Sequence, residues 1–163
     1  MMNDTTIVQR LRQFLFGLAG FMCAGTIVEL LLAKHFDEPM QIVPFVLCAA
    51  GLVVVLLAWK RPSRAILQAL RAIMALLTIG SLIGVYEHIA GNLEVVREVQ
   101  PNAATSTVLL KTLTGAAPLL APGILALVAL LAIAATYYHP VLTSNTGTAQ
   151  PRFGTRQPRK EIQ

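Results

Sequence analysis

Charged side chains are scarce in this chain of 163 residues. Asp, Glu, Lys and Arg make up only 13% of the sequence, whereas 55% of it is hydrophobic. A soluble domain typically carries about twice that charged share. The apolar residues also gather in runs of about 20, which is the length that crosses a hydrocarbon core of about 30 Å as a helix. The composition therefore predicts an all-α integral membrane protein and leaves no room for a separate soluble domain.

Cysteine is almost absent, and no catalytic motif is present. The two cysteines, Cys23 and Cys48, both fall inside apolar runs. They do not form the C-x-x-C pair that thiol–disulfide exchange requires. A phosphate loop, a nucleophile elbow, a zinc motif and a Ser-His-Asp arrangement are missing as well. We therefore expect a protein that is not an enzyme, that binds no cofactor and no metal, and in which both cysteines are small buried hydrophobic side chains.

The net charge of +5 is compatible with a nucleic-acid partner, but the placement of the charges is not. The basic residues flank apolar runs, and no basic stretch with interleaved aromatic residues is present. Cations beside membrane spans set topology and contact anionic headgroups. We therefore expect the lipid bilayer to be the partner, with a membrane protein or a second copy of this chain as a further one, and no nucleic acid.

Four apolar runs predict an integral membrane four-helix bundle, with spans at about 13–33, 41–59, 72–90 and 121–138. Ser63 is expected to cap the third helix, which continues beyond the membrane as far as Gln100. A short interfacial helix is expected at 105–113, so a short extracytoplasmic segment separates spans three and four. Residues 1–143 then form one transmembrane domain, and 144–163 are predicted to be a disordered basic cytoplasmic tail.

The basic residues predict the orientation of the bundle. Lys34, Arg97 and Lys111 fall on one side of the four spans, and the remaining ten of the 13 Lys and Arg residues fall on the other. Positive residues are enriched on the cytoplasmic side of membrane proteins, so both termini are expected in the cytoplasm. The ten are Arg10, Arg12, Lys60, Arg61, Arg64, Arg71, Arg152, Arg156, Arg159 and Lys160.

Two carboxylates lie inside predicted spans, where ionisable groups are costly and become candidates for function. Glu29 in the first span and Glu87 in the third each lie about 9 Å outward of the centre of their span. Gly80 and Gly84 share a face with Glu87 and form a G-x-x-x-G, which permits close helix packing. A comparable face around Gly25 carries Glu29, and we expect the two faces to meet.

The candidate polar cluster of Glu29, Glu87 and His88 has two interpretations. It could form a proton-relay or cation site in the outer half of the bundle, with His88 or His35 as a further ligand. It could instead provide only a hydrogen bond between helices. His139 falls at the cytoplasmic end and is not expected to join it.

The C-terminal half carries a recurring set of residues, namely Glu87-His88, Gly91-Asn92, Glu94, Glu98, Pro101, Pro118, Leu120-Ala121-Pro122-Gly123 and Tyr137-Tyr138-His139-Pro140. This pattern resembles that of small bacterial inner-membrane proteins that span the membrane four times and have no assigned activity. The resemblance implies a bacterial inner-membrane location. It also directs attention to a polar cluster at the outer mouth of the bundle, formed by Asn92, Glu94 and Glu98 together with His88.

These observations favour a non-enzymatic accessory or scaffold subunit of a membrane complex. Short connections, small residues in the spans and the lack of catalytic motifs all agree with it. The alternative is a small transporter or a proton- or cation-handling protein that uses Glu29, Glu87 and His88. A membrane redox protein with a haem or a metal is the third reading.

Overall fold

The computed structural model describes residues 4–34, 36 and 39–143, and every regular element among them is a helix. The predicted tail at 144–163 and His35 lie outside the described residues. The helices are α1 (Asp4–Leu32), α2 (Pro39–Lys60), α3 (Arg64–Val99), α4 (Thr105–Leu113), α5 (Leu120–Ala135) and α6 (Pro140–Thr143).

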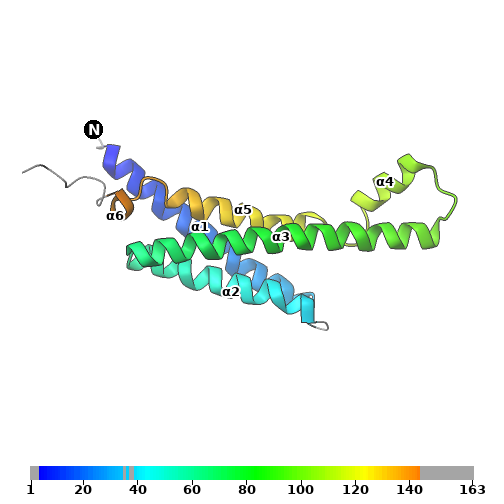
Figure 1. The fold of residues 1–163 in the computed structure, drawn as a ribbon, viewed down its shortest axis with the longest axis horizontal. Coiled ribbons are helices and arrows are strands. Elements are labelled where there is room, and N and C mark those ends of the chain that lie inside the picture. Colours follow the sequence, from blue (N-terminus) through cyan, green and yellow to red (C-terminus); the bar gives the residue numbers. More distant parts are fainter. Residues whose placement is uncertain (1–3, 35, 37–38, 144–163) are drawn as a thin grey trace, which may run out of the picture.

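Helices α1, α2, α3 and α5 form a bundle in which each packs against two neighbours. α1 packs on α2 and α5, and α3 packs on the same two helices, so α1 and α3 occupy opposite corners. Figure 1 shows the C-terminal part of α3 projecting beyond the bundle, with α4 folded back beside it. The largest fully buried apolar side chains are Phe16, Val55, Leu67, Leu70, Met74, Leu77 and Val128.

Three of these helices, α1, α2 and α3, are long and apolar enough to cross a membrane. α5 is also apolar but has only 16 residues, about 24 Å at 1.5 Å per residue. That is shorter than the hydrocarbon core of about 30 Å. The structure therefore supports a helical membrane protein with three helices of spanning length and a fourth, shorter apolar helix packed among them.

Several predicted boundaries are confirmed in the third and fourth helices. The hydroxyl of Ser63 accepts a hydrogen bond from the backbone N–H of Ile66 at 3.2 Å, which caps α3. α3 runs without a break to Val99, and α4 occupies the predicted range of 105–113. A continuous helix of 36 residues measures about 54 Å and must extend beyond a bilayer core of about 30 Å.

Two boundaries differ from the prediction. α1 begins at Asp4, well before the expected start of the first span, and so carries Arg10 and Arg12 on regular helix. α5 ends at Ala135, short of Tyr138, because the chain turns there. Tyr138 has a positive φ of 47°, a conformation that is rare for a bulky residue and ends a helix.

Candidate functional site

Glu29 and Glu87 are not brought together. They lie on α1 and α3, which occupy opposite corners of the bundle, and both side chains are exposed on the outside of the isolated chain. Neither forms a hydrogen bond or an ion pair with another described residue. The expectation that their two helix faces meet is therefore wrong.

The small residues of α3 contact other helices than predicted. A Cβ added at Gly80 would lie 2.7 Å from Cδ1 of Leu47 on α2, and one at Gly84 would lie 2.9 Å from Cβ of Pro122 on α5. A Cβ added at Gly25 on α1 would meet nothing within 4 Å. The G-x-x-x-G of α3 thus provides close packing, as its pattern indicates, but it fits α2 and α5 rather than α1.

His88 acts as a hydrogen-bond donor at the end of the bundle from which α3 projects, which is the end that the sequence predicts to be the outer one. Its Nδ1 lies 2.9 Å from the carbonyl oxygen of Pro118, which can only accept, so Nδ1 carries the proton. This bond ties α3 to the connection that leads into α5. Within the described part of the chain, no three His, Cys, Asp or Glu side chains are close enough together to hold a metal ion.

Asn92 fastens the same connection one turn further along α3. Its side chain is only 5% exposed, and its amide nitrogen donates to the carbonyl oxygens of Thr112 at 3.0 Å and Ala117 at 2.9 Å. The backbone N–H of Ala117 donates back to Oδ1 at 3.0 Å. A Cβ at Gly115 would lie 2.5 Å from this amide, so only glycine fits beneath it. We call Asn92, His88 and the backbone groups that they bind the outer clasp.

The other members of the predicted outer-mouth cluster are placed differently. Glu94 and Glu98 are exposed on the projecting part of α3, as is Arg97. No ion pair links these three side chains in the structure, although their spacing permits one. Asn92 is thus structural, whereas the two glutamates are exposed beside Arg97 on the surface of the projecting helix.

Two arginines bind the C-terminal end of α5, at the opposite end of the bundle. Nε of Arg12 donates to the carbonyl oxygen of Ala135 at 2.9 Å. Nε of Arg71 donates to Oγ1 of Thr136 at 2.9 Å, and its Nη2 donates to the carbonyl oxygen of the same residue at 3.3 Å. The last carbonyls of a helix lack partners within the helix and carry partial negative charge, so cations stabilise them. Arg71, expected to extend toward the headgroups, instead reaches across to α5.

The turn after α5 brings His139 back against α1. The positive φ of Tyr138 reverses the chain, and His139 is only 7% exposed. Its Nδ1 accepts a hydrogen bond from the backbone N–H of Val141 at 3.3 Å, so in the neutral ring the proton is on Nε2. Burial, and next the positive charge of Arg12, lower the pKa of His139 below its ordinary value of 6.5. The neutral imidazole is therefore the favoured form.

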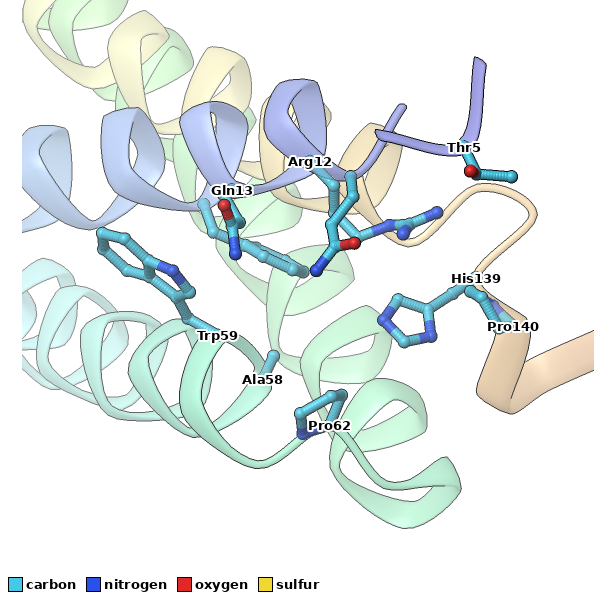
Figure 2. A pocket seen from close by; sticks show the side chains of 10 residues that line it. Thr5, Arg12, Gln13, Ala58, Trp59, Pro62, His139 and Pro140 are labelled. Atoms are coloured by element: carbon cyan, nitrogen blue, oxygen red, sulfur yellow. The ribbon is translucent and has the colours of Figure 1, made fainter. Parts of the chain in front are cut away.

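A cavity of about 340 Å³ with both polar and apolar side chains in its lining opens at this end of the bundle, between α1, the end of α2 and the turn after α5. Figure 2 shows Arg12, Gln13, Trp59 and His139 arranged around the same space, from three separate segments of the chain. We call it the basic-end pocket; its lining residues are Thr5, Gln9, Arg12, Gln13, Phe16, Ala58, Trp59, Pro62, His139 and Pro140.

A second, open and apolar hollow of about 440 Å³ adjoins the pocket on the surface of α1. Gln13 and Trp59 line both hollows. A Cβ at Gly17 would lie 3.3 Å from the indole of Trp59, so glycine lets the ring lie close to α1. We call this second hollow the apolar groove; it is lined by Gln13, Phe14, Gly17, Leu18, Phe21 and Trp59.

The sequence signalled this end of the molecule only as a cluster of positive charge. Arg12 and Arg71 were predicted to set topology, and their hydrogen bonds to α5 depend on a pairing of α5 with α1 and α3 that no local pattern encodes. His139 was set aside because it falls at the opposite end from Glu87. Lys60 and Arg61, next to Trp59, were predicted to set topology, and their pattern did not predict a cavity.

Both cysteines are buried, free thiols, as predicted. Comparison with protein-family models, with curated proteins and with solved structures found no match for this chain. Its function is therefore inferred from the residues and their arrangement.

Proposed function

We propose that the protein is a non-enzymatic accessory or scaffold subunit of a membrane complex, that it spans the bilayer four times, and that it presents the α3–α4 projection to a partner outside the membrane. Support for the fourth span comes from the alignment of α5 with α3. Their contacts extend from Arg71 and Thr136 at one end to His88 and Pro118 at the other. The stretch of α3 between these contacts rises about 25 Å, close to the thickness of a hydrocarbon core.

The proposed orientation places the basic end in the cytoplasm of a bacterial cell, at the inner membrane. Among the described basic residues, Arg10, Arg12, Lys60, Arg61, Arg64 and Arg71 belong to this end, where α1 begins, α2 ends and α3 begins. Lys34, Arg97 and Lys111 belong to the other. This asymmetry favours a cytoplasmic basic end and an extracytoplasmic projection. The bacterial location rests on the resemblance alone.

The interior of the bundle favours a scaffold over a transporter. Met74 and Leu77 are fully buried on α3, between Arg71 at the basic end and Ser81 further along the helix. Ser81 donates its hydroxyl proton to the carbonyl oxygen of Pro122 at 2.7 Å and is thereby satisfied. Ion and proton pathways need chains of ionisable or hydrated groups. The described core offers a packed apolar layer instead.

The projection is the single observation that carries the proposal. α3 extends well beyond the bilayer thickness, and the outer clasp holds α4 against it. Leu109, Leu110 and Leu113 of α4 remain exposed, an apolar surface on the part of the chain farthest from the basic end. A stiff helix pair that carries exposed leucines is suited to binding a partner helix or groove.

Photo-crosslinking in native membranes tests this proposal. A photoreactive residue at Leu109 is expected to give one discrete adduct with a second protein, whereas the same residue at Leu127 on α5, also exposed, should label lipid. Asn92→Ala should reduce the Leu109 adduct severalfold, because loss of the three amide hydrogen bonds costs about 2 kcal/mol and loosens α4. The matched control is Asn102→Ala, which changes an exposed asparagine just beyond α3.

Two outcomes would count against a scaffold. The first is an adduct pattern at Leu109 indistinguishable from that at Leu127. The second is ion flux in liposomes that contain the purified protein and that Glu87→Gln abolishes, which would establish the transport alternative instead.

A further inference from the structure

We infer that the basic-end pocket and the apolar groove together bind one anionic phospholipid, with its phosphate in the pocket and an acyl chain in the groove. The inference needs only that α1 and α2 cross the membrane. It does not depend on the scaffold role or on which side of the membrane the pocket faces.

The pocket offers hydrogen-bond donors suited to a phosphate group. A guanidinium has five N–H donors, and the bond to Ala135 uses only the one on Nε of Arg12. No other described residue takes the remaining donors of Arg12, which therefore stay available for oxygen atoms in the cavity. Gln9 and Gln13 add side-chain amides, and His139 adds its Nε2–H. Arginine with several neutral donors is a combination that recurs in phosphate recognition.

The charge of the pocket also favours an anion. Its lining includes one cation and, among the described residues, no carboxylate. Lys60 and Arg61 lie in the chain between the lining residues Trp59 and Pro62, and they add positive charge beside the opening. An anion there would also oppose the field of Arg12 that lowers the pKa of His139. The positive charge of the lining therefore favours a bound anion over a bound cation.

The groove distinguishes a phospholipid from free phosphate. It adjoins the pocket, since Gln13 and Trp59 line both, and its remaining residues are apolar or glycine. Phe14 and Phe21 are largely exposed, so the hollow is open to the surrounding lipid. A free phosphate would leave such a groove empty, whereas a phospholipid carries both a phosphate and an acyl chain.

The point on α1 at which the pocket gives way to the groove matches the change from headgroups to acyl chains in a bilayer. The long apolar run of α1 starts at Phe14, directly after Gln13, and the groove lies on that run. The pocket lies on the preceding polar turns, which include Gln9 and Arg12. Trp59 sits at the junction, the headgroup level at which tryptophan is enriched. Along α1 the pocket is followed by the groove, just as the headgroup of a lipid is followed by an acyl chain that points into the membrane.

Trp59 provides the test, because it is the one tryptophan of the sequence. The full-length protein is reconstituted in phosphatidylcholine vesicles that contain a small fraction of lipid brominated on its acyl chains, and quenching of the indole fluorescence is measured. Brominated phosphatidylglycerol should quench at about fivefold lower mole fraction than brominated phosphatidylcholine, the preference expected for one well-placed cation. Inorganic phosphate at constant ionic strength should not reverse this quenching.

Variants separate the pocket from general surface charge. Arg12→Gln should abolish the preference for phosphatidylglycerol. Because that change also removes the bond to Ala135, Gln13→Leu serves as a second variant: its side chain lines both hollows and bonds to no other described residue, so the fold should persist while the preference weakens. Arg64→Gln is the matched control, since Arg64 is an exposed cation of the same end that does not line the pocket.

The inference is overturned by equal quenching with both lipids, or by a preference that Arg64→Gln reduces as much as Arg12→Gln does. It is also overturned if inorganic phosphate protects the Trp59 signal in an Arg12-dependent way while the lipids show no preference, which would make the pocket a free-phosphate site. If Arg12→Gln does not fold, full retention of the preference in Gln13→Leu decides against the site.

Discussion

His139 links the basic-end pocket to pH. Burial and the charge of Arg12 lower its pKa in the folded protein below the ordinary value of 6.5, which it regains on unfolding. The unfolded chain therefore binds more protons as the pH falls through this range, and folding stability decreases. We expect full stability above about pH 7 and a lower Tm in detergent at about pH 5.5.

The variant His139→Gln isolates this contribution. It keeps a side chain of similar size without a titratable ring, so the fall in Tm between these two pH values should become smaller. An unchanged fall would show that other groups cause the pH dependence. Addition of phosphatidylglycerol to the wild-type protein should also diminish the fall, because an anion in the pocket counteracts Arg12.

At the outer end, single residues were harder to interpret from the sequence. Asn92, Glu94 and Glu98 are neighbours on one helix, and the sequence grouped them as one polar cluster. The structure buries Asn92 and leaves the two glutamates exposed. The difference arises because α4 and the following connection lie over one face of α3 only. Which face a distant segment covers depends on tertiary packing, so spacing along α3 did not predict it.

At the scale of elements, the glycines of α3 show where the helix contacts a neighbour and where its surface is open. A Cβ at Gly84 would meet the rigid ring of Pro122, whereas one at Gly91, two turns further along the same helix, would meet nothing within 4 Å. Gly84→Ala should therefore force α3 and α5 apart and lower the free energy of unfolding by about 1–3 kcal/mol. Gly91→Ala should leave it unchanged or raise it by up to about 1 kcal/mol, because alanine favours helix.

Unfolding of the two purified variants in detergent measures this difference. Gly80→Ala should fall between them, since its added methyl would meet the flexible end of Leu47. Equal stability of the Gly84 and Gly91 variants would contradict the close approach of α3 and α5. The result also bears on the proposed fourth span. Because α5 is short, the proposal that it crosses the membrane rests mainly on its packing against α3.

Element boundaries were predicted well where local chemistry sets them. The Ser63 cap and the range of α4 agree with the structure. The end of α5 did not follow from local chemistry, because Arg12 and Arg71 arrive from other helices to bind its last carbonyls. The aromatic pair after α5 suggested a longer helix, since such residues mark the membrane surface whether or not the backbone is helical.

For the whole molecule, the apolar runs predicted the helices of the bundle but not which helices pack together. Matching depth of Glu29 and Glu87 suggested that their helices meet. In a four-helix bundle with short connections, however, successive helices become neighbours and the first and third end on a diagonal. α2 and α5 therefore separate the two glutamates. The depth of a residue in the membrane can be estimated from its own helix alone. Whether two helices contact each other depends on how all four are arranged in the bundle.

The number of spans also belongs to the whole molecule, and labelling with a membrane-impermeant maleimide tests it. The background is Cys23→Ala with Cys48→Ala, and single cysteines are placed at the exposed positions Arg64, Lys111 and Tyr138. In spheroplasts, Lys111→Cys should react, whereas Arg64→Cys should react only after permeabilisation.

Tyr138→Cys, just beyond α5, decides between the topologies. Four spans predict that it is protected like Arg64→Cys. If α5 does not cross the bilayer, it must react like Lys111→Cys, and the hydrogen bond from Arg12 to Ala135 would then join residues on opposite sides of the membrane, which its 2.9 Å length forbids. Labelling of Tyr138→Cys in intact spheroplasts would therefore contradict both the fourth span and the packing of α5 against α1.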